Sequence, residues 1–178
     1  LNYKKSCALI VTYNRPKLLI RALSSLYNQT VKLDKIIIVD NASADGSVEM
    51  LKEKFSEFNL IFNTDNVGFS KANNQAIRVA QGEFILLLNP DTVVAEDTFK
   101  KTIDFMDETP DCGGLGTRMI DGRGNFLPES KRGLPTPLVA FYKISGLSKI
   151  FPASKKFGQY HLGHLSEFEI NEIDILSG

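Results

Sequence analysis

The stretch that decides the fold class reads Lys35-Ile36-Ile37-Ile38-Val39-Asp40. Four successive β-branched apolar residues leave no polar face, which is typical of a strand buried on both sides in a parallel sheet. Asp40 ends this strand as a carboxylate that has no partner in its own segment. The stretch therefore predicts a central parallel strand with a polar group at its carboxyl end.

Strand and helix patterns alternate on both sides of this stretch. The expected strands are residues 7–11, 35–40, 60–62 and 84–88. Two helices are expected to begin after Asn14, an N-cap candidate with Pro16 in the first turn, and after Asp45, a second cap candidate. Two more are expected at 70–80 and 97–107. This βαβαβαβα order predicts an α/β fold, with a mainly parallel, Rossmann-like sheet and helices on both faces.

The pattern changes after Gly113-Gly114. The elements expected beyond it are a strand at 115–120, a hairpin turn at 121–125, a short amphipathic helix at 138–150 and a strand at 170–176. We expect a single domain overall. Its alternating α/β region covers residues 1–120, and a less regular region follows at 121–178.

Charge is balanced over the whole chain but not within it. Basic and acidic residues both total 21, and this net charge of zero gives no sign of a nucleic-acid-binding protein. Between Arg118 and Tyr160, eight basic residues stand against two acidic ones. We interpret this stretch as a solvated basic face. The alternative is a surface that meets an anionic membrane or a phosphate-bearing molecule.

The two cysteines, Cys7 and Cys112, have no metal-ligand spacing. Both are expected to be small buried hydrophobic residues in a reducing compartment. No apolar run approaches the ~18 residues of a membrane span, and the polar residues 1–6 do not resemble a signal peptide.

Polar side chains follow all four expected strands. These segments are 12–15, 40–46, 63–69 and 89–92. Because ligands of open parallel sheets bind outside the carboxyl ends of the strands, this pattern predicts a binding site at that edge. The sequence has no GxGxxG, GxxxxGK[ST] or GxSxG motif, which argues against a dehydrogenase, a P-loop enzyme and an α/β-hydrolase.

A diphosphate site without a phosphate loop can hold its charge through a divalent cation and carboxylates. Asp91, which follows Asn89-Pro90, is the candidate ligand, and its alternative role is to close a turn. Asp40 is either an acceptor for a nucleobase N–H or part of an Asx-turn, and we weight these equally. His161 and His164 are interpreted as structural or solvent-facing rather than as metal ligands.

The strand-end segments together resemble the family 2 glycosyltransferases, and particularly their rhamnosyltransferase-like branch. The matching segments are Val11-Thr12-Tyr13-Asn14-Arg15, Val39-Asp40-Asn41-Ala42-Ser43-Ala44-Asp45-Gly46-Ser47, Asn66-Val67-Gly68-Phe69-Ser70-Lys71-Ala72-Asn73-Asn74 and Leu87-Leu88-Asn89-Pro90-Asp91-Thr92. The resemblance is strong from residue 7 to about 120 and fainter beyond. It implies a GT-A fold, a nucleotide-sugar donor and a divalent metal, Mg²⁺ or Mn²⁺.

The resemblance also implies roles for individual residues. Asp40 binds the base, and Asp91 is the metal ligand at the position of the family's DxD motif, where Asn89 replaces the first acid. The residues that line or flank the donor are Thr12, Tyr13, Asn14, Arg15, Asp40, Asn41, Ser43, Asn66, Gly68, Phe69, Asn73 and Asn89.

The reaction implied by the resemblance is inverting transfer of a sugar, a hexosyltransferase reaction, from UDP- or dTDP-sugar to a saccharide or lipid-linked acceptor in cell-surface polysaccharide synthesis. dTDP-rhamnose is one candidate donor. In the family, the catalytic base lies beyond a Ser-Gly-Ala element, whose start resembles Ser177-Gly178. We therefore expect a C-terminally truncated chain that binds donor but transfers sugar poorly, with its base beyond Gly178.

Two other functions remain open at this point, a sugar nucleotidyltransferase and a non-catalytic nucleotide-sugar-binding module. The first should carry a glycine-rich basic loop after strand one, where this chain has Thr12-Tyr13-Asn14-Arg15-Pro16. The apolar and basic segment 134–156 is a candidate for peripheral membrane contact. The resemblance implies a cytoplasmic protein or one at the cytoplasmic face of a membrane.

Overall fold

The computed structural model describes residues 6–176. The chain forms two compact units that divide between Thr109 and Pro110. We call the part up to Thr109 the sheet unit and the part from Pro110 the C-terminal unit. This division lies just before the change of sequence pattern at Gly113-Gly114.

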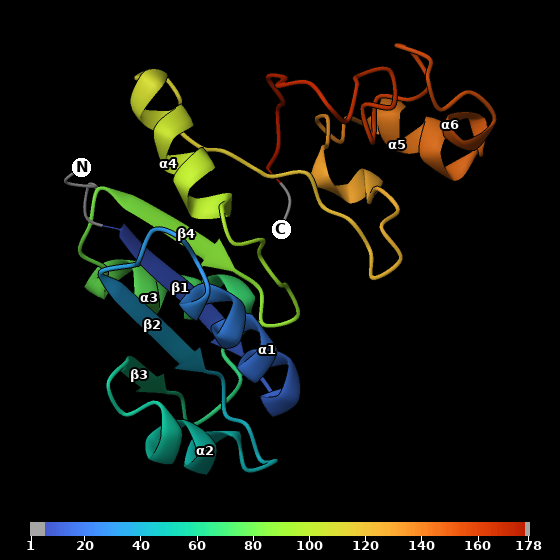
Figure 1. Cartoon of the computed structure of the whole chain (residues 1–178). Coiled ribbons are helices and arrows are strands. Elements are labelled where there is room, and N and C mark those ends of the chain that lie inside the picture. Colours follow the sequence, from blue (N-terminus) through green and yellow to red (C-terminus); the bar gives the residue numbers. More distant parts are fainter. Residues whose placement is uncertain (1–5, 177–178) are drawn as a thin grey trace. The chain divides into compact units, whose positions relative to one another are not determined.

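The sheet unit contains four parallel strands in the order β3-β2-β1-β4 (Figure 1). They are β1 (Ser6–Thr12), β2 (Lys35–Asp40), β3 (Asn59–Phe62) and β4 (Phe84–Leu88). Each lies where the sequence predicts a strand, with ends that differ by one residue at most. The predicted parallel α/β sheet is therefore confirmed.

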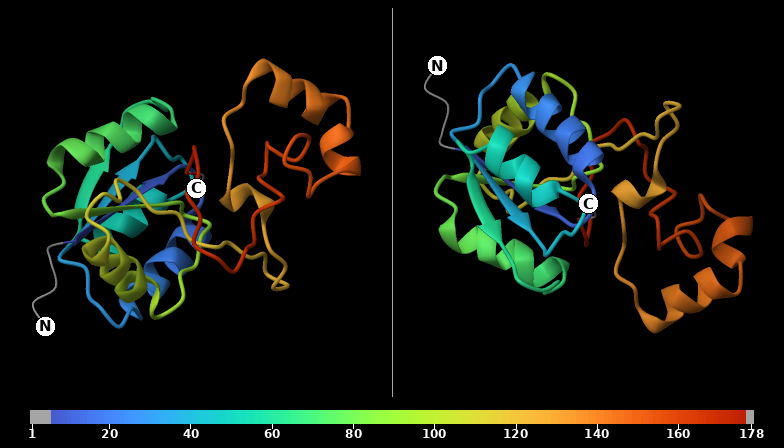
Figure 2. Two further views of the ribbon diagram at one scale, coloured as in Figure 1. Left: turned by 90° about the horizontal axis from the view of Figure 1, so that it is seen from above. Right: turned by 90° about the horizontal axis from the view of Figure 1, so that it is seen from below.

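Helices cover both faces of this sheet (Figure 2). They are α1 (Pro16–Tyr27), α2 (Ser47–Lys54), α3 (Phe69–Val79) and α4 (Thr98–Glu108). Successive strand residues point to opposite faces. Ala8 and Ile10 of β1 pack in one core with residues of α1, α2 and α4. Leu9 and Val11 pack in a second core, against Ala72 and Ala76 of α3.

Both predicted helix caps are wrong in detail. Pro16 is the first residue of α1, as expected, but the N-cap is Arg15. Asn14 instead has a φ of 52°, and its side-chain oxygen accepts a hydrogen bond from the Ala44 N–H at 2.8 Å. At α2 the N-cap is Gly46, with a φ of 84°. The Asp45 carboxylate reaches past it to the Ser47 N–H and hydroxyl, at 3.2 and 2.5 Å.

The C-terminal unit contains short helical elements. They are the 3-10 turn η1 (Pro128–Ser130), α5 (Pro137–Ile144) and α6 (Leu147–Ile150). The single helix expected at 138–150 is wrong, because Gly146, with a φ of 81°, separates α5 from α6. The predicted turn at 121–125 is confirmed, since the Asp121 carboxylate accepts the N–H groups of Arg123 and Asn125.

The strands expected at 115–120 and 170–176 are wrong. Each segment forms only an isolated bridge, Ile120 with Phe126 and Arg132 with Ile175. An apolar run becomes a strand only where a neighbouring strand continues the ladder of hydrogen bonds. Neither segment meets such a neighbour among residues 110–176, so the apolar character of the sequence alone is not enough.

Two expectations about apolar residues can be compared with the structure. Cys7 is fully buried, as predicted, whereas the prediction that Cys112 is buried is wrong, because it is partly exposed. No helix within residues 6–176 has both the length and the apolar character to cross a membrane. Residues 1–5 and the Ser177-Gly178 pair lie outside the described residues.

Candidate functional site

A cavity of about 290 Å³ opens at the carboxyl ends of the strands in the sheet unit. Its lining consists of Val11, Thr12, Tyr13, Arg15, Asn41, Asn66, Phe69, Asn89, Pro90 and Asp91. The chain passes from β1 to β2 and β3 on one side, then returns to place β4 on the other side of β1. Such a reversal splays the loops after β1 and β4 apart, and it is where open α/β sheets bind ligands.

Two buried oxygens near this cavity lack hydrogen-bond partners among residues 6–176. They are Oγ1 of Thr12 and Oδ2 of Asp40. The two residues are paired across β1 and β2, so their side chains share one face of the sheet. The other oxygen of Asp40, Oδ1, accepts the Ser43 N–H at 2.8 Å. The Asx-turn interpretation and the ligand interpretation are therefore compatible, because the turn uses one oxygen and leaves the other unpaired.

A network of side-chain amides fixes the loops that follow β2 and β3. Asn41 Nδ2 donates to Asn66 Oδ1 at 2.7 Å, and Asn41 Oδ1 accepts from Asn63 Nδ2 and from the Val67 N–H, both at 3.1 Å. Asn63 and Gln75 of α3 exchange two further bonds of 2.9 Å. Asn41 is buried, Asn63 and Gln75 are half-buried, and their mutual hydrogen bonds restrict the motion of these side chains. The network therefore holds Asn66 and the start of α3 in place beside the cavity.

A second link joins the loops after β1 and β2. The Asn14 N–H donates to Ser43 Oγ at 2.8 Å, and Asn14 Oδ1 accepts the Ala44 N–H at the same distance. Asn14 and Ala42 have φ values of 52° and 70°, which are uncommon for residues other than glycine. The surrounding contacts hold this backbone against its intrinsic preference, as is common at functional loops.

The structure separates the predicted site residues into two groups. Thr12, Tyr13, Arg15, Asn41, Asn66, Phe69, Asn89 and Asp91 line the cavity. Asn14, Asp40, Ser43, Gly68 and Asn73 are not in its lining. Asn14 and Ser43 form the loop link, Gly68 is the N-cap of α3 with a φ of 84°, and Asn73 donates to the Phe69 carbonyl at 3.0 Å.

Four residues of the site have no individual role predicted from the sequence, although Asn63 and Pro90 lie in the strand-end segments 63–69 and 89–92. Val11 and Pro90 line the cavity through their positions in the chain, next to Thr12 and Asp91. Asn63 and Gln75 complete the amide network. Asn63 follows β3 directly, and this place at a strand end is the signal that puts it among the polar residues of the site.

Asp91 offers one unshared carboxylate to the cavity. It is exposed and forms no hydrogen bond or ion pair with the described residues. Within residues 6–176, no group of three or more His, Cys, Asp and Glu side chains is arranged to bind a metal. His161 and His164 therefore belong to no such group. A single carboxylate fits a cation such as Mg²⁺, which protein sites often hold through one or two carboxylates together with substrate phosphates.

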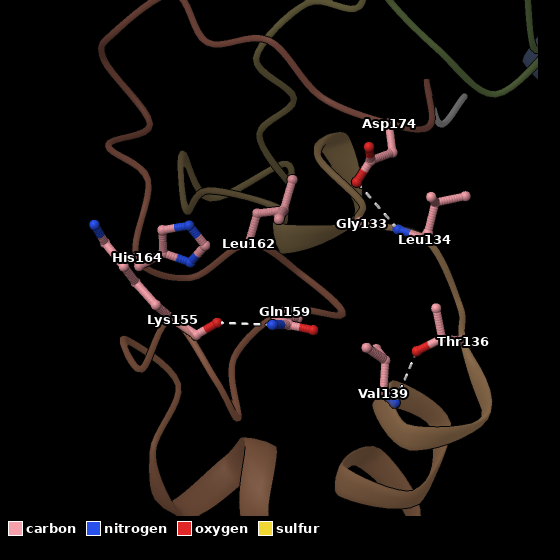
Figure 3. Close-up of a pocket in the computed structure, with 9 residues that line it drawn as sticks. All are labelled: Gly133, Leu134, Thr136, Val139, Lys155, Gln159, Leu162, His164 and Asp174. Atoms are coloured by element: carbon pink, nitrogen blue, oxygen red, sulfur yellow. Dashed lines mark hydrogen bonds between the residues drawn. The ribbon is translucent and has the colours of Figure 1, made fainter.

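The C-terminal unit has its own cavity of about 340 Å³ (Figure 3). Several of its polar groups are already used by nearby backbone. Asp174 accepts the Leu134 N–H at 3.3 Å, Thr136 accepts the Val139 N–H at the start of α5, and Gln159 donates to the Lys155 carbonyl. Burial lowers the pKa of His161 in this unit, and the charge of Lys143 adds to the effect, so the imidazole is neutral near pH 7.

Comparisons with known proteins cover most of the chain. Residues 7–162 match the family model for Glycosyl transferase family 2. An uncharacterized glycosyltransferase of Methanocaldococcus jannaschii is 32% identical over 68% of this chain and 44% of its own length. A poly(ribitol-phosphate) beta-glucosyltransferase of Bacillus spizizenii is 34% identical over 67% of this chain and 20% of its own.

A solved glycosyltransferase structure is also similar to this chain. The crystal structure of Staphylococcus aureus TarS residues 1–349 in complex with UDP has a TM-score of 0.58 and 27% identity, covering 72% of this chain and 40% of that one. This chain thus spans less than half the length of each of these three proteins. The parallel sheet and these neighbours confirm the α/β fold of GT-A type. The chain belongs to Glycosyl transferase family 2.

Proposed function

We propose that the sheet unit binds a nucleoside-diphosphate sugar, the donor in a glycosyl transfer. The observation that carries this proposal is the pair of unpartnered buried oxygens, Thr12 Oγ1 and Asp40 Oδ2, at the ends of adjacent strands beside the cavity. A buried acceptor without a hydrogen bond costs about 1–3 kcal/mol, which a bound donor group would recover. The UDP in the Staphylococcus aureus TarS complex supports the same class of ligand.

The charge of Asp40 favours particular bases. A carboxylate oxygen only accepts hydrogen bonds. Uracil and thymine carry an imino N–H that can donate to it, whereas cytosine presents a bare acceptor nitrogen at that position. We therefore infer that the site prefers UDP or dTDP to CDP. Tyr13 and Phe69 line the cavity with exposed rings, which are suited to stacking on a base or a sugar.

The diphosphate would lie near Arg15 and Asp91, the charged residues of the lining. Arg15 has an exposed guanidinium that can pair with phosphate oxygens. Asp91 and the amide of Asn89 would hold Mg²⁺ or Mn²⁺. The chemistry that such a cation supplies when bound is neutralisation of charge on the leaving diphosphate.

We infer an inverting hexosyl transfer to a saccharide or lipid-linked acceptor in cell-surface polysaccharide synthesis. The Bacillus spizizenii relative, named for glucosyl transfer to poly(ribitol-phosphate), supports this setting. The resemblance to the rhamnosyltransferase-like branch makes dTDP-rhamnose a candidate donor. We assign the reaction to the cytoplasm or to the cytoplasmic face of the membrane. No catalytic base is assigned among residues 6–176.

The test is calorimetric titration of the whole chain with UDP, dTDP and CDP in the presence of Mn²⁺. Asp40→Asn keeps the oxygen that accepts the Ser43 N–H but turns the free oxygen into a donor. UDP affinity should fall about tenfold or more, the scale of a hydrogen bond to a charged group, and the preference for UDP over CDP should shrink.

Asp104→Asn on the exposed face of α4 makes the same change of charge and is the control. It should leave UDP affinity unchanged. Equal UDP affinity in the wild type and Asp40→Asn would refute the assigned role of Asp40. Failure of UDP and dTDP to bind the wild type would refute the proposed donor site.

A further inference from the structure

The helices α5 and α6 direct apolar side chains into solvent. Leu138, Phe141 and Ile144 follow each other at three-residue spacing along α5, and Ile144 is 87% exposed. Val139 and Tyr142, on a neighbouring face of the helix, are buried. Residues three apart lie on one side of a helix, so the exposed side chains form a continuous stripe.

Two further apolar side chains are exposed beyond α5. Ile150, at the end of α6, and Phe151, directly after it, are 67% and 50% exposed. The two helices contact each other within the C-terminal unit (Figure 1). Large exposed apolar groups in such a cluster mark interaction surfaces more often than single exposed residues do.

The stretch of sequence that contains α5 and α6 carries basic residues and no acidic ones. No aspartate or glutamate occurs between Glu129 and Glu167, and this interval holds Lys131, Arg132, Lys143, Lys149, Lys155 and Lys156. Some of these cations have partners, since Lys143 lies over the Tyr160 ring at 3.5 Å and Lys131 donates to the Leu165 carbonyl. Lys149 and Lys155 are exposed and pair with no carboxylate of residues 6–176.

We propose that α5 and α6 dock on the surface of an anionic lipid bilayer. The apolar stripe enters the boundary between headgroups and acyl chains, and Lys149 and Lys155 meet lipid phosphates. In this proposal the helices lie in the interface; no helix within residues 6–176 has the length and apolar character to cross a membrane. A second copy of the chain fits this face poorly, because it would bring the same positive charges together.

The test is flotation of the whole chain with vesicles of phosphatidylcholine alone and of phosphatidylcholine mixed with phosphatidylglycerol. The chain should float with the anionic vesicles and remain behind with the neutral ones. In the double variant Phe141→Ser with Ile144→Ser, the affinity for the anionic vesicles should fall by about tenfold or more. Lys149→Glu with Lys155→Glu should cause a similar loss, since each cation near the surface contributes about 1 kcal/mol.

The matched control is Phe168→Ser with Ile170→Ser, which removes two exposed apolar side chains of the same unit that lie outside α5 and α6. It should float like the wild type. An equal loss in this control, equal binding to neutral vesicles, or self-association of the wild type through Phe141 in ultracentrifugation would overturn the proposal. UDP titration of each variant reads the donor site separately, so failure of one proposal leaves the other standing.

Discussion

The two units differ in how much of their apolar surface they bury. In the sheet unit, β1 and β2 bury their side chains on both faces, in two cores. In the C-terminal unit, Val139 and Tyr142 are the buried apolar side chains among residues 110–176, whereas Ile144 and Phe168 are 87% and 80% exposed. Helices on both faces cover the apolar residues of the central strands β1 and β2, whereas Ile85 and Leu87 of the edge strand β4 remain 45% and 54% exposed. Short helices and turns cover far less and leave apolar groups available for partners.

The largest expected effect compares one core residue with one exposed residue. Leu9→Ala, in the middle of β1, removes a fully buried side chain and should lower the free energy of unfolding by about 2–5 kcal/mol. Ile144→Ala on α5 should change it by less than about 0.5 kcal/mol. Urea unfolding followed by circular dichroism measures both. Similar losses in the two variants would break the contrast between the units.

A smaller change in the free energy of unfolding than that of Leu9→Ala is expected when an amide of the network is removed, and removal of an exposed amide in the same unit is the comparison. Asn41→Ala removes the acceptor of the Val67 N–H and of Asn63, which should cost about 1–3 kcal/mol. Asn74→Ala, on the exposed side of α3, should stabilise slightly, because alanine is the better helix former by about 0.5 kcal/mol. Both values come from the same urea experiment. An unchanged free energy of unfolding in Asn41→Ala would mean that the network does not stabilise the fold.

The last comparison uses the unmodified chain and measures how readily each of the two cysteines reacts. Burial raises the pKa of the Cys7 thiol, so little thiolate is present at neutral pH, and the side chain is inaccessible. Cys112 is partly exposed. Iodoacetamide followed by peptide mass spectrometry should modify Cys112 in the native chain and Cys7 only after denaturation. Rapid native labelling of Cys7 would show that the sheet core opens readily.

The same contrast explains which parts of the fold could be predicted from the sequence. The apolar runs of β2 and β4 lie in a sheet whose neighbours continue the ladder, so local pattern and tertiary structure agree. Residues 115–120 and 170–176 have strand-like composition but meet no neighbour to extend their isolated bridges. Gln29 follows α1 and is buried, where its side-chain amide bonds the Ala95 carbonyl and the Phe99 N–H, long-range contacts that local sequence does not indicate.

The candidate site could be predicted to the level of its loops. Polar residues after parallel strands must gather at one edge of the sheet, and Thr12, Asn41 and Asp91 meet there around one cavity. Which of these polar residues line the cavity and which hold the loops in place depends on side-chain geometry, and the spacing of residues in the sequence does not show this. Asn14 therefore forms a link to Ser43 rather than a helix cap, and Asp40 divides its two oxygens between a turn and an unpaired position.

Our main proposal is that the rigid edge of the sheet unit is a nucleotide-sugar site in which Asp91 holds a metal. Calorimetric titration of the whole chain and of Asp91→Ala with UDP, with and without Mn²⁺, is its sharpest test. We expect Mn²⁺ to tighten UDP binding to the wild type and to have no such effect on Asp91→Ala. Binding that ignores Mn²⁺ in both proteins, or a metal effect that survives in the variant, would refute the proposed metal role of Asp91.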